Sequence, residues 1–172
     1  PLLYDRQVFK KVGNYQALRN FSCTVNAGDV VGIADRVGTG KNALIRMLNG
    51  KVAPDRGEVW LNGRKLQWPF PSVSSGIRVV YEKPALADSL NITNNIFLGQ
   101  EIHRGGLLKW LNIPHQRQMD QQAAQVLGWL GATLPSLHAP VGNLTDEQQQ
   151  LIALAHAKVS QANLMVIEDP SP

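Results

Sequence analysis

The chain has 172 residues, of which 44% are hydrophobic and 17% charged, and 17 Lys and Arg against 13 Asp and Glu leave a formal net charge of +4. This composition is typical of a globular domain and excludes a disordered chain, a collagen and a coiled coil. The longest apolar runs, such as residues 164–167, are far shorter than the ~20 residues that cross a bilayer, so we expect no membrane span.

Cysteine and histidine usage argues against a disulfide framework and against a zinc site. The chain has one cysteine, Cys23, and four scattered histidines, His103, His115, His138 and His156. A single thiol cannot form an internal disulfide, and no metal-ligand spacing links it to the histidines. The sequence therefore indicates a reducing, cytosolic setting.

The basic charge does not indicate nucleic-acid binding. The pI is about 9.4, but the only tight basic pair is Lys10-Lys11, without interleaved aromatic residues that could stack on bases. We therefore expect no nucleic-acid partner. The chain begins at Pro1 without a start Met or a leader and ends at Pro172 just after an apolar run, which is typical of a fragment of a longer protein.

The first fifty residues predict strands, a glycine loop and a helix. Phe21, Cys23 and Val25 alternate with polar residues in the two-residue period of a half-buried strand. The continuously apolar run 30–33 predicts a second, buried strand, which leads into a glycine-rich loop. Residues 43–48 then predict a helix, because apolar residues recur there and Asn49-Gly50 closes it.

The next thirty residues predict a hairpin, a loop and another strand. Residues 59–61 alternate into Asn62-Gly63, a strong hairpin signal, and residues 64–67 return. Residues 68–75 hold two prolines and three serines and predict a loop. The apolar run 77–81 predicts the strand that follows it.

The second half of the chain is mainly helical by pattern. From residue 84 to about 140, apolar residues recur at helical spacing on a glutamine-rich background, as at Ala123, Val126, Leu127 and Leu130. This pattern predicts an inserted helical subdomain. A helix from Asp146 to about Lys158 and a strand at 164–167 complete the predicted elements.

The glycine loop has part of a phosphate-binding motif. Such a loop needs glycines for close approach of backbone N–H groups, a lysine for the terminal phosphates and a hydroxyl for magnesium. Here Gly38-Thr39-Gly40-Lys41 is present, but Asp35 replaces the first glycine and Asn42 the hydroxyl residue. On these residues alone, a phosphate loop and an ordinary glycine turn both remain open.

Beyond the loop, the sequence resembles the ATP-binding subunits of ABC transporters, most closely the N-terminal half of the tandem ATPases of the carbohydrate-uptake group. The resemblance runs nearly from end to end. It is carried by the segments 16–22, 49–50, 94–101, 106–110, 140–144, 144–150 and 164–171, which stand in the order and spacing of that family's motifs.

The resemblance implies an α/β fold. It consists of a P-loop NTPase core with an N-terminal antiparallel β subdomain and an inserted helical subdomain at 84–143, within one nucleotide-binding domain fragment spanning 1–172 that is truncated at its C-terminus. The implied function is that of an ATP-binding component of a sugar import system. The implied partners are a membrane-spanning transporter subunit and a second nucleotide-binding domain, which would place the chain on the cytoplasmic face of the membrane.

The resemblance also implies a site for ATP and Mg²⁺. The residues expected to bind the nucleotide are Gly38, Thr39, Gly40, Lys41, Asn42 and Ala43, with Tyr15 stacking on adenine because Val12 occupies the family's aromatic position. Asn42, Glu82 and Glu168 would surround the metal.

Almost every motif departs from the family pattern at its chemical position. Glu82 replaces the glutamine that contacts magnesium and the attacking water, and the acidic pair after the last strand is transposed to Glu168-Asp169. Asp169 would polarise the water and Glu82 would assist it. The signature that clamps the partner's γ-phosphate reads Thr145, Asp146, Glu147 and Gln148.

The signature segment has two interpretations. Thr145 and Gln148 have the spacing of a helix capping box, and Asp146 and Glu147 are favourable first-turn residues, so the segment is expected to favour helix stability over phosphate binding. We therefore expect ATP hydrolysis to be weak or absent. The alternative to a transport ATPase is a non-catalytic ABC domain that regulates a competent partner; a P-loop kinase fits the segments 144–150 and 164–169 less well.

Overall fold

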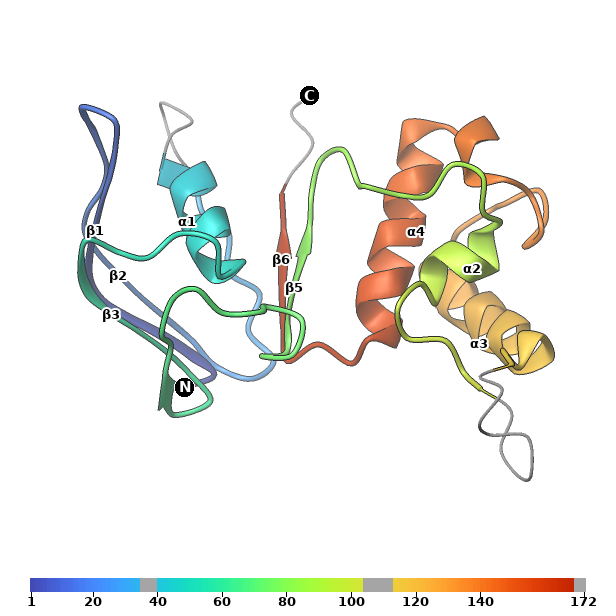
Figure 1. Cartoon of the computed structure of the whole chain (residues 1–172), viewed down its shortest axis with the longest axis horizontal. Coiled ribbons are helices and arrows are strands. Elements are labelled where there is room, and N and C mark those ends of the chain that lie inside the picture. The colour runs from blue at the N-terminus through green and yellow to red at the C-terminus, as the bar shows by residue number, and fades with distance from the viewer. Residues whose placement is uncertain (35–39, 104–112, 169–172) are drawn as a thin grey trace. The chain divides into compact units, whose positions relative to one another are not determined.

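The computed structural model describes residues 1–34, 40–103 and 113–168. The described chain divides into two compact units. The first comprises the described residues within 1–79 together with 163–166, and the second the described residues within 80–162 together with 167 and 168. Figure 1 shows the elements of both units.

The first unit is built on a four-stranded antiparallel sheet with the strand order β2-β1-β3-β4. Its strands are β1 (Leu3–Val12), β2 (Tyr15–Val25), β3 (Arg56–Leu61) and β4 (Arg64–Lys65). The predicted hairpin at Asn62-Gly63 is confirmed, with both residues at positive φ, 50° and 72°, as a two-residue type I′ turn requires. The returning strand is shorter than predicted, because only Arg64 and Lys65 pair with β3.

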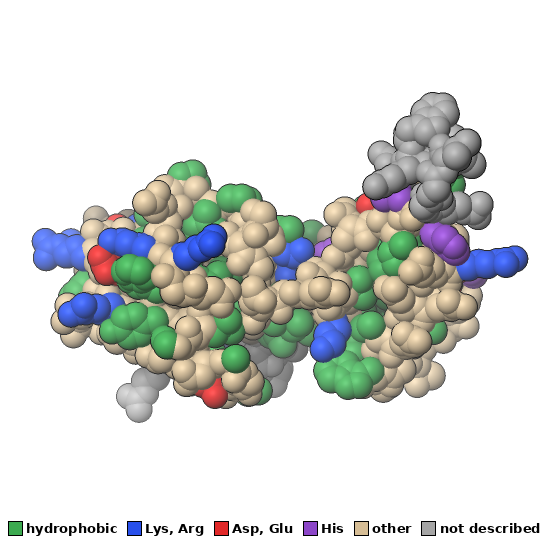
Figure 2. Space-filling model, turned by 90° about the horizontal axis from the view of Figure 1, so that it is seen from below, with side chains coloured by type: hydrophobic (Ala, Val, Ile, Leu, Met, Phe, Trp, Pro, Cys, Tyr) green, Lys and Arg blue, Asp and Glu red, His purple; other side chains and the backbone are tan. Residues whose placement is uncertain are grey.

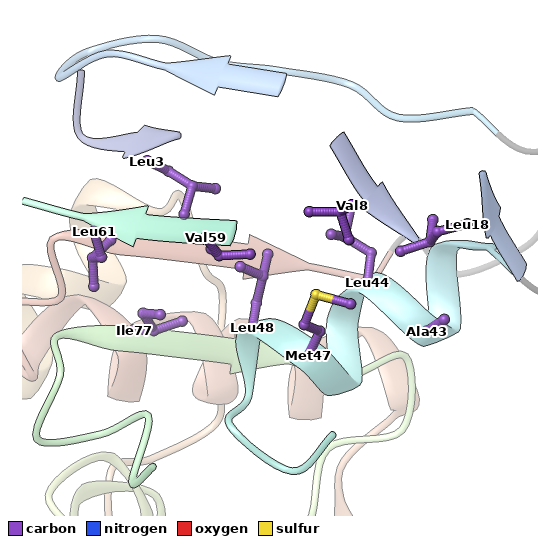
Figure 3. Packing of buried hydrophobic residues seen from close by; sticks show 10 residues of the cluster. All are labelled: Leu3, Val8, Leu18, Ala43, Leu44, Met47, Leu48, Val59, Leu61 and Ile77. Atoms are coloured by element: carbon purple, nitrogen blue, oxygen red, sulfur yellow. The ribbon is translucent and has the colours of Figure 1, made fainter. Parts of the chain in front are cut away.

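Helix α1 (Gly40–Leu48) packs against this sheet. Met47 is fully buried, and the apolar side of the helix contacts residues from the strands, as Figure 3 shows for Leu44 beside Val8 and Leu48 beside Val59. The helix ends at Leu48, and the turn that follows includes Gly50, where φ is 74° and a Cβ atom would collide with the Phe70 carbonyl oxygen. The prediction of a helix closed by Asn49-Gly50 is therefore confirmed.

The strand predicted at residues 30–33 is wrong. These residues adopt no regular secondary structure, and Val30 is fully exposed to solvent while Val31 and Ile33 are more than two-fifths exposed. A strand needs a neighbour to satisfy its backbone groups, and no segment of the described chain pairs with this run. The prediction was wrong because apolar composition does not determine whether another strand pairs with the run.

Strands β5 (Ile77–Val80) and β6 (Leu164–Ile167) form a separate two-stranded sheet. The amide of Leu164 donates to the Gly76 carbonyl (3.1 Å) and that of Glu168 to the Val80 carbonyl (2.9 Å). Because both partners advance by four residues, the pair is parallel. Both strands were predicted. The predicted limits of β6 agree with the structure, whereas the predicted strand 77–81 extends one residue beyond the end of β5 at Val80.

The second unit is helical. It holds α2 (Ile92–Ile96), α3 (Gln116–Trp129), a short 3-10 helix at Val141–Asn143 and α4 (Asp146–Val159). Its core buries Ile92, Ile96, Phe97, Met119 and Ile152. Residues 123 and 127 of the predicted helical stripe are buried, and residues 126 and 130 are partly buried against the same core, so this amphipathic pattern is confirmed.

One buried side chain organises the segment that leads into α2. Asn95 is only 2% exposed, and its amide makes four hydrogen bonds. Its Oδ1 accepts from the Ala87 amide (2.8 Å), and its Nδ2 donates to the carbonyls of Ala87 (3.0 Å), Leu90 (3.2 Å) and Asn91 (3.1 Å). The loop before α2 is thus tied to the helix by a single side chain.

A second buried polar residue, Asp5, has an unsatisfied group. It lies on β1 between Cys23 of β2 and Val59 of β3, is 1% exposed, and its Oδ1 has no hydrogen-bond partner. Burial raises the pKa of this carboxyl from 3.8 to about 6.

Across the three described segments, no helix is long and apolar enough to span a membrane.

Candidate functional site

The first candidate region is the start of α1. Gly40 is buried in the first turn, and Lys41 and Asn42 are exposed there. The first turn has no acidic residue, so nothing within it opposes the partial positive charge of the backbone N–H groups. The predicted loop residues Gly38 and Thr39, together with Asp35, lie outside the described residues.

Ala43 follows these residues and has a structural role. Its side chain is 4% exposed and belongs to the same buried cluster as Leu18 of β2. It therefore anchors the start of α1 to the sheet, and only its backbone remains available to a ligand. If Ala43 binds the nucleotide as predicted, it does so through its backbone amide and not through its side chain.

The second candidate region is the hairpin that joins β1 and β2. Val12 and Tyr15 are directly opposed across the strands, so their side chains share one face of the ribbon. Both are about half exposed, at 50% and 49%. The hairpin and the N-terminal end of α1 both point to the top of Figure 1.

The third candidate region follows the paired strands β5 and β6. Glu82 and Glu168 come just after these strands, and the carboxyl ends of parallel strands meet at one edge of a sheet. Glu82 is exposed and Glu168 is partly exposed. No group of three or more metal-ligating His, Cys, Asp or Glu residues occurs in the described parts of the chain, and the predicted catalytic residue Asp169 lies outside them.

The fourth candidate region is the start of α4, where the predicted capping box is complete. Thr145 Oγ1 accepts from the amide of Gln148 (3.3 Å), and Gln148 Oε1 accepts from the amide of Thr145 (3.1 Å). The Thr145 hydroxyl also donates to Glu147 Oε2 (3.2 Å). The hydroxyl is thus already engaged, and Asp146 and Glu147 place two carboxylates in the first turn.

The glutamines after the predicted signature have positioning roles that the sequence analysis did not identify. Gln150 Nε2 donates to the Glu82 carbonyl (3.0 Å), and Gln149 Nε2 donates to the Leu144 carbonyl (3.2 Å). Gln150 thereby holds the segment after β5 against α4. The run of three glutamines at 148–150 was the available signal, since amides placed at a helix start bond readily to nearby carbonyls.

Comparisons with known proteins extend over nearly the whole chain. Residues 18–171 match the family described as ABC transporter. The fructose import ATP-binding protein of Rhizobium meliloti is 31% identical over 99% of this chain and 67% of its own length. The ribose import ATP-binding protein of Yersinia pestis is 31% identical over 99% of this chain. The xylose/arabinose import ATP-binding protein of Sulfolobus acidocaldarius is 31% identical over 99% of this chain and 66% of its own length.

The chain therefore spans about two thirds of the fructose and xylose/arabinose relatives but only 33% of the ribose relative. Among solved structures, a nucleotide-free ATP-binding cassette of an ABC transporter matches with a TM-score of 0.76 and 23% identity, covering 99% of this chain and 70% of the other. An ATP-binding cassette bound to ADP and Pi matches with a TM-score of 0.75 and 19% identity, covering 98% of this chain and 74% of the other.

The solved structures establish the fold, namely an ABC ATPase fold with a P-loop NTPase core and an antiparallel β subdomain. The family match covers far more than half of the residues. The chain belongs to the ABC transporter family, as an ATP-binding domain.

Proposed function

We propose that this chain is the ATP-binding component of a sugar import system and binds the nucleotide phosphates through the loop at 35–42. The observation that carries the proposal is the composition of the first turn of α1, which holds an exposed lysine and backbone amides and has no acidic residue of its own. A cation in the first turn of a helix opposes the macrodipole unless an anion binds there. The relatives named for fructose, ribose and xylose/arabinose import support the sugar group.

The hairpin residues supply the proposed contact to the base. Tyr15 offers an aromatic ring at a half-exposed position directly across from Val12. An adenine ring could stack on Tyr15 while Val12 covers its edge. This arrangement supports the proposal that Tyr15 takes the role of the aromatic residue that the family has at the position of Val12.

Magnesium would be held by oxygen ligands. Glu82 and Glu168 follow the two paired strands, and Asn42 lies in the first turn of α1. Carboxylate and amide oxygens suit Mg²⁺, which commonly keeps one or two protein carboxylates with phosphates and waters as its remaining ligands. Their side-chain oxygens are thus of the kind that Mg²⁺ prefers. The ion would neutralise phosphate charge, and Asp169 would orient a water.

The proposed partners are a membrane-spanning transporter subunit and a second nucleotide-binding domain. Membership in the family supports both. A chain of this kind would work at the cytoplasmic face of the membrane, held there by its partner. The second nucleotide-binding domain would belong to the same or another chain.

The proposal is tested by titrating ATP with Mg²⁺ into the protein and measuring the heat of binding. We expect saturable binding that Lys41→Ala abolishes. Lys51→Ala is the matched control, because it removes one lysine from an exposed position just beyond the end of α1. Equal binding by the Lys41 variant, or no binding by the unmodified protein, would reject the proposal.

A second candidate function is a non-catalytic ABC domain that regulates a competent partner. The complete capping box at α4 favours it, because the Thr145 hydroxyl is engaged within its own helix and two carboxylates stand beside it. A carboxylate close to a bound phosphate would repel it. This interpretation keeps ATP binding and removes turnover.

Phosphate release at saturating ATP and Mg²⁺ distinguishes the two candidates. For the regulatory function, release stays near the uncatalysed rate and does not change in Lys41→Ala. The variant Asn42→Ser, Glu168→Asp, Asp169→Glu should raise it, because a well-placed general base contributes ~10²–10⁴-fold. Turnover by the unmodified chain of about 1 s⁻¹, within the range of working enzymes, would support the transport ATPase instead.

A further inference from the structure

A groove lies on the sheet of the first unit, between β1 and β3. Its volume is about 390 Å³, within the range of small-molecule sites. It involves none of the four candidate regions described above. Its lining residues are Arg6, Gln7, Phe9, Arg56, Gly57 and Glu58.

The groove is formed by an irregularity in the strand pairing. The register of β1 with β3 shifts between Arg6 and Phe9, and Gln7 has a φ of 47°, which is uncommon for a residue other than glycine. Opposite it, Gly57 has a φ of 93°, and a Cβ there would collide with the carbonyl oxygens of Gln7 and Arg6. Bulges of this kind redirect side chains and occur often at functional sites.

The wall beside Arg56 is held in place by its neighbour Asp55. The Asp55 carboxylate accepts from Lys10 Nζ (2.7 Å) and from the Lys11 amide (2.6 Å), and the Asp55 amide donates to the Phe9 carbonyl (2.9 Å). The hydrogen bond from Lys10 lowers the pKa of Asp55, so the carboxylate stays ionised at neutral pH. The groove therefore has a defined wall where β1 meets β3.

The charges at the groove are unbalanced. Glu58 is its only lining carboxylate, and its oxygens accept from Lys65 Nζ (2.5 Å) and Trp60 Nε1 (3.2 Å). The hydrogen bonds from Lys65 and Trp60 lower the pKa of Glu58, and the charge of Arg6 lowers it to a lesser extent. Within the described chain, no hydrogen bond or ion pair engages the guanidinium of Arg6 or Arg56. On the face drawn in Figure 2, Lys and Arg side chains stand out from the surface of the first unit.

We propose that this groove binds a small organic oxyanion, either a carboxylate or a phosphate monoester. The guanidinium groups of Arg6 and Arg56 donate to its oxygens, since the planar fork of arginine matches both anions. Phe9, which is partly buried, contacts the carbon part of the ligand. The groove has two arginines and one carboxylate, and Lys65 already forms an ion pair with that carboxylate, so positive charge is in excess there.

The test uses phenyl phosphate and benzoate as probes, with neutral benzyl alcohol as a control ligand, and measures binding by calorimetry. At least one anion should bind saturably and more tightly than inorganic phosphate, because its ring contacts Phe9. Arg6→Gln and Arg56→Gln should each weaken binding by about tenfold or more, as expected for loss of a hydrogen bond to a charged group.

Two controls distinguish binding in this groove from non-specific electrostatic attraction of the anion to the protein surface and from binding at the phosphate loop. Arg64→Gln removes the same charge from β4 of the same sheet, outside the groove, and should change affinity by less than about twofold, as for an exposed charge. Lys41→Ala should leave phenyl phosphate binding intact while it removes ATP binding. The NMR signal of the Trp60 indole N–H should shift with the probe, and that of Trp129 in the other unit should not.

Three outcomes would overturn the proposal. They are the absence of saturable binding by either anion, an equal loss in Arg64→Gln, and loss of binding in Lys41→Ala with retention in Arg6→Gln. Failure of ATP to bind in the separate titration would leave this site unaffected, because none of its residues belongs to the phosphate loop.

Discussion

The two units of this protein place charge in opposite ways. At the start of α1 in the first unit, the first turn carries Lys41 and backbone amides and has no acidic residue of its own. At the start of α4 in the second unit, a capping box and two carboxylates satisfy the amides and offset the helix dipole. The first unit also buries the unpartnered carboxyl of Asp5.

This difference separates binding from stability. A helix whose first turn holds carboxylates and a capping side chain has little left to offer an anion. A first turn without acidic residues gains less stability from its own sequence and is the better place for an anion. Residues 145–148, which the resemblance predicts to be the signature, form a capped helix start that favours stability. Three predictions can break or sharpen this comparison, and they follow in order of expected effect.

The largest effect on stability is expected from Asp5→Asn. Burial raises the pKa of Asp5 from 3.8 to about 6. Below pH ~4 the carboxyl is protonated in both the folded and the unfolded state, and it does not destabilise the fold. As the pH rises through 6 the buried carboxyl ionises, and this stability is lost. At about 1.4 kcal/mol per pKa unit, the ionised carboxylate lowers the free energy of unfolding by about 3 kcal/mol above pH 7. Urea unfolding should show a gain of that order for the variant at pH 8 and little gain at pH 4.

Two further measurements check this prediction. The charge of Asp5 adds to burial in raising the pKa of Cys23, so in Asp5→Asn the thiol should react faster with iodoacetamide at pH 8. Asp55→Asn should have the opposite sign, lowering stability at pH 7, because hydrogen bonds lower the pKa of Asp55. Equal gains for Asp5→Asn at pH 4 and pH 8 would contradict the burial of an ionised carboxylate.

A smaller effect is expected from Thr145→Ala. The change removes the side chain that caps α4, and loss of such a cap lowers the free energy of unfolding by about 1 kcal/mol. Thr145→Ser keeps the hydroxyl and should retain most of the stability. If both variants unfold at the same denaturant concentration as the original protein, the α4 start is not the stabilising element inferred here.

The smallest effects come from two matched substitutions that exchange the chemistry of the helix starts. Asn42→Asp adds a carboxylate to the first turn of α1 and should raise stability by ~0.3–1 kcal/mol while weakening ATP binding. Asp146→Asn removes one from α4 and should lower stability by a similar amount. Thermal unfolding and ATP titration are measured in parallel. Tighter ATP binding by Asn42→Asp would contradict the comparison.

The sequence predicts a structural feature correctly where the interactions that stabilise it are between residues close together in the chain. The Asn62-Gly63 turn and the Thr145–Gln148 capping box each depend on neighbouring residues, and the structure has both. Their physical determinants lie within four residues of one another. A single sequence is sufficient for features of this kind.

Features that depend on distant partners could not be read in the same way. The run 30–33 has the apolar composition of a buried strand, yet pairing depends on segments elsewhere in the chain, and none of those described pairs with it. The burial of Asp5 depends on its neighbours Cys23 and Val59 on two other strands. The groove at Arg6 and Arg56 requires a register shift that no local signal announces.

The four hydrogen bonds of the Asn95 side chain have a consequence for motion. They connect the carbonyls and the amide of residues 87–91 to α2 through one buried group. Such a loop does not open by itself, since exposing the Ala87 amide to water requires the Asn95 side chain to leave its place in the core. Amide hydrogen exchange at Ala87 should therefore be as slow as in α2, so that the loop and the helix open together as one cooperative unit.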